Sequence, residues 1–361
     1  MSGARKAGPI APGGPSEKPR APAPRPRAAG RQDERGPASK IVVEGAALPI
    51  RKPSILFNLA RFLARRNIRG GWRLWLHLID SGALDQVARY ELQGPARAAP
   101  LLVPLYRRES SWSEAEVAEY EWKVVRAVIE RLSASSRDFA LIDCGADIGL
   151  VASALARGSE RVKSVVAYEP NREAFALLEA SLNCWPIEAR AVPAGVGERA
   201  MRARLVEVEG NASAHARYLV EDPDGPIEVR RVDDEPVPAH LGVVLKVDVE
   251  GLELAVVRGA LETLRRAPEF VVTFEAHPKV VRRTGVDPCA VIQLIASTAP
   301  IDVAIAELPG VAIDPQAPFF SQLGAASEQI CNVVCMRKPR PLAVSTRDQP
   351  QSGDGREASG A

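Results

Sequence analysis

Two acidic residues stand beside a glycine loop in the middle of the chain. The run Asp143-Cys-Gly-Ala-Asp-Ile-Gly149 follows an apolar segment. Glu169 lies 26 positions after Asp143, at the end of a second apolar segment. Gly145 and Gly149 let a backbone approach a ligand closely, and an acid at a strand tip can accept hydrogen bonds from both ribose hydroxyls. The pattern predicts a strand, a loop, a helix and a second strand that together bind a nucleoside-containing cofactor.

The glycine spacing indicates which cofactor this is. A dinucleotide site uses G-x-G-x-x-G, whereas this loop has D-x-G-x-x-x-G and places Asp147 close to where phosphates would lie. The charges of Asp143 and Asp147 would repel a diphosphate, which disfavours a nicotinamide oxidoreductase. S-adenosylmethionine has a ribose, an ammonium and a sulfonium but no phosphate, so it fits better. The alternative is an ordinary glycine turn, and the acid at Glu169 weakens that alternative.

A second cluster of ionisable residues lies in the run Leu245–Glu253. If this run is a strand, Lys246, Asp248 and Glu250 point to one face. A central parallel strand is normally apolar on both faces, so three such residues indicate a site at the end of the strand. Lys246 could instead only neutralise Asp248 in a structural ion pair.

A third run, Phe270–His277, also ends in polar residues. Glu275 and His277 share a face of this predicted strand. If it neighbours the strand of Asp248, the four side chains of Asp248, Glu250, Glu275 and His277 gather beside the cofactor. His277 could also merely end the strand, and the carboxylates could hold a magnesium ion, although no fixed ligand spacing supports a metal.

The periodicity of the chain predicts an α/β fold, because strands alternate with helices from residue 137 onward. An inserted hairpin is expected at 200–208 and 226–232, on the edge of the sheet. The predicted strands are 139–144, 164–169, 188–192, 243–249, 270–276, 302–307 and 330–336, and the predicted helices are 148–157, 171–183, 252–265 and 287–297.

The regions before and after this domain differ in composition. Residues 1–40 hold nine Lys/Arg and three Asp/Glu, with eight prolines, and together with 340–361 they are predicted to be disordered tails. Residues 41–136 are predicted to be a helical lead-in, with helices over 54–80 and from Ser113 to Leu132 and a short hairpin around Gly94-Pro95. Residues 137–339 are then the cofactor-binding domain. Four of the five tryptophans (Trp72, Trp75, Trp112, Trp122) fall in the lead-in, and we expect them in its core rather than in a pocket.

The overall composition excludes several classes of protein. A net charge of +2 gives no whole-chain argument for nucleic acid, and no segment has the roughly 20 apolar residues that span a bilayer. Five cysteines without a C-x-x-C pair suit reduced thiols in a cytoplasmic protein better than disulfides or a zinc site. We therefore expect a cytoplasmic protein with a small-molecule partner, no nucleic acid and no membrane. The oligomeric state is left open.

Together these motifs resemble the FkbM-type methyltransferase family. The matching elements are Asp143–Gly149, Tyr168-Glu-Pro-Asn171, Leu245–Glu253 with Gly259-Ala260, and Phe274-Glu-Ala-His-Pro278. The resemblance implies a class I methyltransferase fold, which is a Rossmann-like, mostly parallel sheet of seven strands whose last strand is antiparallel. It also implies S-adenosylmethionine as cofactor and a hydroxyl of a sugar or other small metabolite as acceptor. This chain has Asp147 where the family more often has Asn.

The predicted function is O-methylation, and the alternative is a non-catalytic scaffold that kept the fold. Transfer of a methyl group to an alcohol needs alignment and a base for the proton. Asp248 or Glu250 is the predicted base, Lys246 would keep it ionised, and His277 is the second choice, with Glu275 in the same cluster. The predicted cofactor-binding residues are Asp143, Gly145, Ala146, Gly149, Glu169 and Asn171, with no metal; Asp143 would orient the amino-acid end and Glu169 the ribose.

Overall fold

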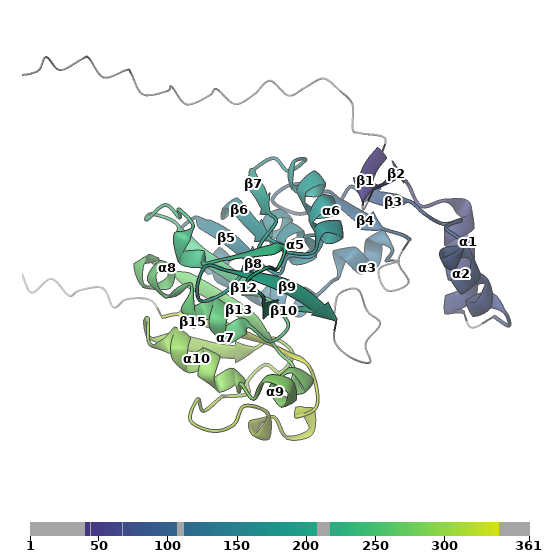
Figure 1. Cartoon of the computed structure of the whole chain (residues 1–361). Helices are drawn as coiled ribbons and strands as arrows, with labels where there is room; N and C mark the ends of the chain where they lie inside the picture. Colours follow the sequence, from purple (N-terminus) through teal and green to yellow (C-terminus); the bar gives the residue numbers. More distant parts are fainter. Residues whose placement is uncertain (1–39, 44, 67, 107–111, 208–216, 339–361) are drawn as a thin grey trace, which may run out of the picture. The chain divides into compact units, whose positions relative to one another are not determined.

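The computed structural model describes residues 40–43, 45–66, 68–106, 112–207 and 217–338. All of them belong to one compact unit (Figure 1). Apart from Lys40, the tails predicted at 1–40 and 340–361 lie outside the described residues.

Seven strands pair into the central sheet. They are β5 (Phe139–Cys144), β6 (Val162–Tyr168), β7 (Glu188–Val192), β12 (Gly242–Val247), β13 (Phe270–Ala276), β14 (Ile301–Ile305) and β15 (Cys331–Arg337). Their order is β14-β15-β13-β12-β5-β6-β7 (Figure 1). The strands from β13 to β7 are parallel, and β15 pairs antiparallel with β13 and β14. The prediction of an α/β fold with seven mostly parallel strands is confirmed.

Helices cover both faces of this sheet because its central strands are apolar on both sides. In β5, Leu141 packs into one core with α4 (Trp122–Ala134), α5 (Leu150–Gly158) and α6 (Arg172–Leu182). Its neighbour Ile142 packs into a second core with α7 (Glu253–Arg258), α8 (Leu261–Arg266) and α10 (Pro288–Ala296). The alternation of side chains along the strand thus separates two cores.

Two predicted helices are each divided in the structure. The segment 252–265 forms α7 and α8, because Gly259 and Ala260 leave helical geometry between them. The segment from Ser113 forms α3 (Glu114–Ala118) and then α4, because Glu121 adopts a positive φ of 46°. The predicted capping box of Ser113 and Glu116 is present. The short helices η1 (Val232–Asp234), η2 (Phe320–Gln322), η3 (Gly324–Ala326) and α9 (Pro278–Thr284) were not predicted.

The lead-in segment contains a second sheet as well as helices. Its strands are β1 (Lys40–Val43), β2 (Ala46–Arg51), β3 (Val87–Tyr90) and β4 (Leu101–Pro104), in the order β1-β2-β3-β4, and its helices include α1 (Ile55–Arg65) and α2 (Gly71–Asp80). The predicted hairpin is β3 with β4, and the predicted helices are α1 and α2. Strands β1 and β2 were missed, so the lead-in is not purely helical. Only Trp75 of its four tryptophans is buried, whereas Trp72 and Trp122 are exposed.

The inserted strands form a separate sheet rather than an edge of the central one. They are β8 (Gly195–Val196), β9 (Met201–Glu207), β10 (Arg217–Glu221) and β11 (Ile227–Arg230), in the order β10-β9-β11-β8. Strands β9 and β11 pair antiparallel, as expected for a hairpin. Their placement was predicted wrongly, because these strands pair among themselves around the small core of Ala203, Leu219 and Val229.

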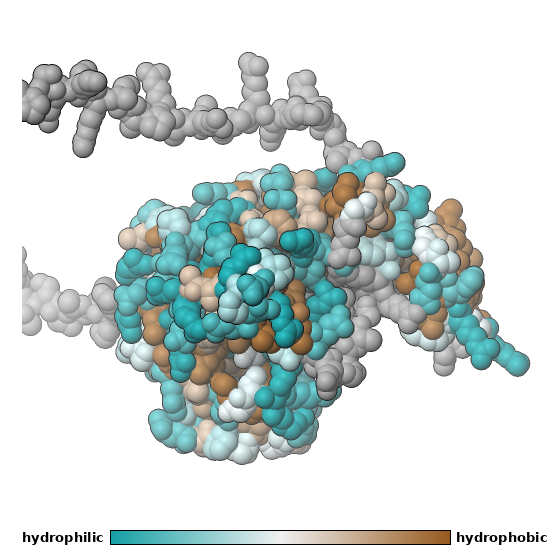
Figure 2. Space-filling view, in the orientation of Figure 1, coloured by the Kyte–Doolittle hydropathy of each residue, from teal (hydrophilic) through white to brown (hydrophobic). Residues whose placement is uncertain are grey.

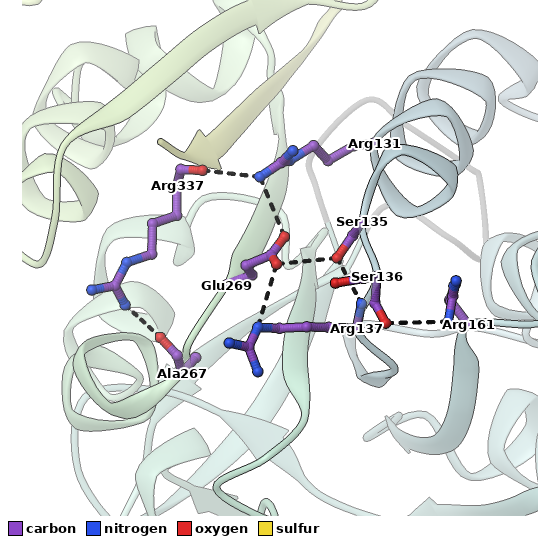
Figure 3. A network of polar contacts seen from close by, with 8 residues as sticks. All are labelled: Arg131, Ser135, Ser136, Arg137, Arg161, Ala267, Glu269 and Arg337. Carbon is purple, nitrogen blue, oxygen red and sulfur yellow. Dashed lines mark hydrogen bonds and ion pairs between the residues drawn. The ribbon is translucent and has the colours of Figure 1, made fainter. Parts of the chain in front are cut away.

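A polar network ties α4 to the amino ends of the central strands (Figure 3). Glu269, one residue before β13, accepts hydrogen bonds from Arg131 and Ser135 and forms an ion pair with Arg137. Arg131 also donates to the backbone carbonyl of Arg337, at the end of β15. The network therefore joins the helix to two strands at the end of the sheet that lies opposite the carboxyl ends of the parallel strands.

The thiols are all free. Cys144, Cys289, Cys331 and Cys335 are buried and Cys184 is exposed. Among the described residues, no helix combines the length and the apolar character that crossing a bilayer requires.

Candidate active site

A cavity of about 270 Å³ opens where the parallel strands end. The loops after β5, β6 and β12 and the end of β13 all contribute to it, as expected for a ligand site in an α/β sheet. Its polar lining includes Asp147, Glu169, Asn171, Arg217, Asp248, Glu250 and Glu275, and its other lining residues include Trp112, Tyr120, Gly145, Ala194, Gly195, Val196, Leu205 and Leu219.

The glycine loop after β5 is held against the loop after β12. Gly145 has a φ of +78°, and a Cβ there would lie 1.8 Å from the backbone oxygen of Asp248. The backbone N–H of Asp248 donates to the carbonyl of Cys144 at 3.0 Å. Only glycine combines this φ with so close a backbone contact, so Gly145 brings the two chemical clusters of the sequence together. Gly149, with a φ of +91°, begins α5 and does not line the cavity.

Glu169 lies where the sequence predicted an acid at the tip of the second strand. Its carboxylate accepts hydrogen bonds from the backbone N–H groups of Asp147 at 2.8 Å and Asn171 at 2.7 Å. Burial, and next the charge of Asp147, raises the pKa of Glu169 to about 7. Each carboxylate oxygen keeps a second lone pair, so the side chain can still accept hydrogen bonds from a ligand in the cavity.

Lys246 connects two of the predicted acids. Its ammonium lies 3.3 Å from Asp143 and 3.2 Å from Asp248, and it donates to the carbonyl of Gly145 at 2.8 Å. Burial lowers the pKa of Lys246, but the two carboxylates outweigh this effect and raise it well above its usual value. Asp143 itself is fully buried behind the cavity wall, so it supports Lys246 rather than facing the cavity.

The three ionisable residues of the second cluster do not share a strand face. Strand β12 ends at Val247, and Asp248 and Glu250 lie in the loop that follows, with Glu250 at a positive φ of 54°. This prediction was wrong because the alternation of a strand cannot continue through a left-handed residue. The loop nevertheless turns both carboxylates to the cavity.

Glu250 and Glu275 face the same cavity and carry unusual pKa values. Burial, and next the charge of Asp248, raises the pKa of Glu250 to about 7 and that of Glu275 to about 8. Because like charges in a poorly hydrated site disfavour further ionisation, these acids hold protons near neutral pH unless a cation binds beside them.

Two further predicted site residues lie outside the cavity lining. His277 caps α9, with its Nδ1 accepting a hydrogen bond from the N–H of Lys279 at 3.0 Å, and it lines a separate small pocket. Burial and the nearby cations, first of all Lys279, lower its pKa. Ala146 is buried in the core beside the loop.

The structure adds residues that the sequence motifs did not predict. Tyr120 and Trp112 contact each other at 5.4 Å between ring centroids and line the cavity from the lead-in. Glu121 follows them, and burial raises its pKa to about 7. The small sheet contributes Arg217, and its strands carried no motif that could have identified this residue. Leu205 and Leu219 come from the same sheet.

The charges of the cavity lining are strongly unbalanced. Five acidic side chains face it (Asp147, Glu169, Asp248, Glu250 and Glu275), four of them from the loops after β5, β6 and β12 and one from the end of β13, whereas Arg217 is the one cationic side chain among the described lining residues. Such a lining favours a ligand that carries positive charge and disfavours a phosphate. No group of three or more His, Cys, Asp or Glu within the part of the chain that the structure describes is arranged to hold a metal ion.

Comparison with known proteins gives one domain match. Residues 143–296 match the methyltransferase FkbM domain, and this segment contains the glycine loop, Glu169 and the second cluster. No curated protein matches the chain.

Several solved structures are similar at low identity. The methyltransferase FkbM from Methylobacillus flagellatus KT is 18% identical, with a TM-score of 0.36, over 55% of this chain and 43% of that chain. An S-adenosylmethionine-dependent O-methyltransferase from Thermotoga maritima is 12% identical, with a TM-score of 0.33, over 72% and 79%. The precorrin-6y C5,15-methyltransferase from Geobacter metallireducens GS-15 is 14% identical, with a TM-score of 0.31, over 60% and 88%. This chain thus spans less than half of the FkbM methyltransferase that it resembles. From the domain match, the chain carries a methyltransferase FkbM domain at residues 143–296, which confirms the resemblance drawn from its motifs.

Proposed function

We propose that this protein is an S-adenosylmethionine-dependent methyltransferase that acts on a hydroxyl oxygen of a sugar or another small metabolite. The observation that carries the proposal is the excess of acidic side chains in the cavity, with five acids and one arginine around a glycine loop, because a bound cation would favour the ionised forms of these acids. The methionine end of this cofactor carries a sulfonium and an ammonium, so carboxylates stabilise it, and the domain match supports the same cofactor.

The residues of the cavity fit this cofactor in three places. Glu169 offers carboxylate lone pairs for the ribose hydroxyls, and Asn171 lies beside it. The segment 194–196 would offer small side chains to the adenine. Asp147 and Asp248 face the cavity from the two loops that Gly145 joins, where the cationic end would lie.

The bound cofactor would supply an electrophilic methyl group, and the chain must supply alignment and a proton acceptor. Asp248 is the best placed acceptor because it faces the cavity and its carboxylate lies 3.2 Å from the ammonium of Lys246, which holds it in position. Glu250 and Glu275 line the same wall and would orient an acceptor hydroxyl. Tyr120 and Trp112 offer aromatic surface for the rest of the acceptor.

A non-catalytic scaffold is the second candidate. Three carboxyls with pKa values raised to about 7 or 8 are costly to gather in one cavity, and a scaffold would not need them. Their presence therefore favours an enzyme.

Calorimetry with the whole chain tests the cofactor. S-adenosylmethionine should bind, NAD should not, and Glu169→Gln should weaken binding by about 1–3 kcal/mol, since hydroxyls of the ribose lose a charged acceptor. Glu188→Gln is the matched control, because Glu188 is an exposed acid on the neighbouring β7 and does not line the cavity. Tight binding of NAD, or equal affinity in Glu169→Gln and the parent, would contradict the proposal.

A further inference from the structure

The helical hairpin of α1 and α2 exposes an unusual number of large apolar side chains. The inner side is packed: Phe57 and Trp75 form an edge contact at 5.4 Å between centroids, and Ala60 and Gly71 are buried. The outer side is not covered by any described residue. Its exposed apolar residues and their exposed fractions are Ile55 (87%), Leu56 (45%), Leu59 (53%), Phe62 (52%), Ile68 (45%), Trp72 (58%) and Leu74 (40%).

Three of these side chains form one apolar stripe along α1. Ile55, Leu59 and Phe62 are spaced at four and three residues, so they lie in one stripe along α1. Trp72 lies in the first turn of α2, which packs directly against α1. Hydrophobic residues are visible at the surface of this hairpin in Figure 2. Soluble proteins rarely leave a surface of this kind exposed unless it binds something.

The charge of the hairpin is as distinctive as its apolar surface. Residues 51–80, which include both helices, contain seven Lys/Arg (Arg51, Lys52, Arg61, Arg65, Arg66, Arg69 and Arg73) and one acid, Asp80. Arg61 and Arg65 pair with Glu116 and fix the hairpin to α3. Lys52, Arg66, Arg69 and Arg73 remain exposed around the apolar stripe. Amphipathic helices that lie in the surface of a bilayer combine these two features.

We infer that the outer face of the α1–α2 hairpin binds the surface of an anionic lipid bilayer. Apolar side chains would enter the boundary between headgroups and acyl chains, and the arginines would contact anionic headgroups. No span is required, so this inference agrees with the finding that no described helix can cross a membrane. It replaces the expectation of no membrane partner, which considered only spanning segments.

Two other occupants suit this face less well. A second copy would bring the same cations together across a symmetric interface, which costs free energy unless anions separate them. The N-terminal 40 residues have a net charge of +6 and contain few large apolar residues, so they match neither the charge nor the apolar stripe. An anionic lipid surface complements both features.

Vesicle flotation with the full-length protein tests this inference. The probes are phosphatidylcholine vesicles with and without phosphatidylglycerol, at low and high salt. We expect at least tenfold stronger binding to the anionic vesicles at low salt, and a loss of most of this difference at high salt, because the Debye length shortens.

Two sets of variants separate the apolar and the charged contributions. Phe62→Asp should weaken binding to the anionic vesicles about tenfold or more. The variant loses a Phe side chain that would be buried in the bilayer, and it gains a negative charge that the anionic lipids repel. The matched control is Ile330→Asp, at an exposed apolar residue outside the hairpin (48% exposed), which should bind like the parent. Arg69→Gln with Arg73→Gln should weaken anionic binding by roughly 30-fold and leave binding to neutral vesicles unchanged. The double variant Arg126→Gln with Arg199→Gln, at exposed arginines of α4 and of the segment before β9, is its control.

Light scattering on the lipid-free protein completes the test. The inference is supported if the protein is a monomer and if its binding to anionic vesicles falls in Phe62→Asp and in the arginine variant but in neither control. A dimer that Phe62→Asp converts to monomer, without flotation of the parent, would assign the face to a second copy and overturn it. Equal flotation of the parent and Phe62→Asp would overturn it as well. Cofactor binding by calorimetry should be unchanged in all four variants, so failure here leaves the proposed function standing.

Discussion

At the scale of single residues, the decisive contact is the one that Lys246 makes with two acids. Asp143 is buried on one side of the ammonium, and Asp248 lies on the other side with about a third of its side chain exposed to the cavity. Asp143, which does not face the cavity, therefore holds the lysine in place. The lysine ammonium in turn lies beside Asp248, which does face the cavity. Asp248 is therefore the acid of this pair that could accept a proton from a ligand in the cavity.

Substitution of Asp248 tests the proposed base. Asp248→Asn should leave the affinity for S-adenosylmethionine nearly unchanged and lower turnover by about 10²–10⁴-fold, because the amide cannot accept the hydroxyl proton. Turnover would be measured on an acceptor found by screening sugars, glycosides and macrolide alcohols. The comparison variant is Glu250→Gln, on the same loop. If both variants turn over at the parent rate, the cluster is structural and another residue is the base.

A chelator distinguishes the magnesium alternative at the same site. Loss of turnover that added magnesium restores would make these carboxylates metal ligands. Unchanged turnover in the presence of a chelator agrees with a base.

At the scale of elements, the site depends on the contact between the loops after β5 and β12. Both loops leave adjacent parallel strands, and Gly145 lets them approach until backbone touches backbone. The third contributor is the small sheet, which brings Arg217, Leu205 and Leu219 to the cavity. The site is therefore built from turns whose spacing is set by sheet register rather than by a single motif.

The substitution Gly145→Ala should damage this contact. Gly145→Ala is expected to destabilise the chain by about 2–4 kcal/mol, since the new Cβ would lie 1.8 Å from the oxygen of Asp248 at a φ of +78°. Gly285→Ala is the matched control, with a φ of +71° and no atom within 4 Å of the added Cβ, so it should cost only about 1 kcal/mol. Urea unfolding measures both. Equal losses in the two variants would show that the loop can relax away from the contact.

The polar network at the other end of the sheet gives an independent test of element packing. Glu269→Ala should lower the free energy of unfolding by about 1–3 kcal/mol, because Arg131 and Ser135 lose their shared acceptor (Figure 3). Affinity for the cofactor should not change, since the network lies away from the cavity. Glu130→Ala, in an exposed pair with Arg126, should cost less than about 0.5 kcal/mol. A loss for Glu269→Ala as small as this would mean that the network does not stabilise the fold.

At the scale of the whole molecule, charge is segregated. The cavity is lined by acidic side chains, whereas residues 51–80 carry seven cations and one acid, so a net charge of +2 conceals two regions of opposite character. Because each surface fits a different ligand, the cationic cofactor and the anionic bilayer would bind without competing.

The segregated acids should make stability depend on pH. The pKa of Glu275 is raised to about 8 in the folded chain, above its ordinary value of 4.5. A carboxyl with a raised folded pKa contributes stability that is fully present below the unfolded pKa and is lost as pH rises through the folded pKa. Glu275→Gln should therefore become more stable relative to the parent as pH rises from about 5 to 8. Urea midpoints across this range measure the difference, with Glu130→Gln as an exposed control. A difference that is constant or shrinks with pH would contradict the raised pKa.

Local sequence was enough to predict most of the central domain. Strands β5, β7 and β13 match their predicted ranges at both ends, and the other strands of the central sheet differ by one or two residues at each end. These elements were predictable because buried strands and amphipathic helices have periodic patterns and the glycine loop has fixed spacing. The same local reasoning identified Glu169 and the acids of the second cluster, which the structure brings to one cavity.

Tertiary structure decided what depends on contacts between distant segments. Glu250 lines the cavity from a loop, where it adopts a positive φ. Asp143 is a buried partner of Lys246 because β5 and β12 lie side by side. Arg217 lines the cavity and His277 caps α9, although no pattern in the segments around these two residues indicated either position. The sequence by itself therefore determined which segments carry chemistry, because spacing and residue type are local. The tertiary structure decided which of those side chains face the same space, because that depends on strand order and loop geometry.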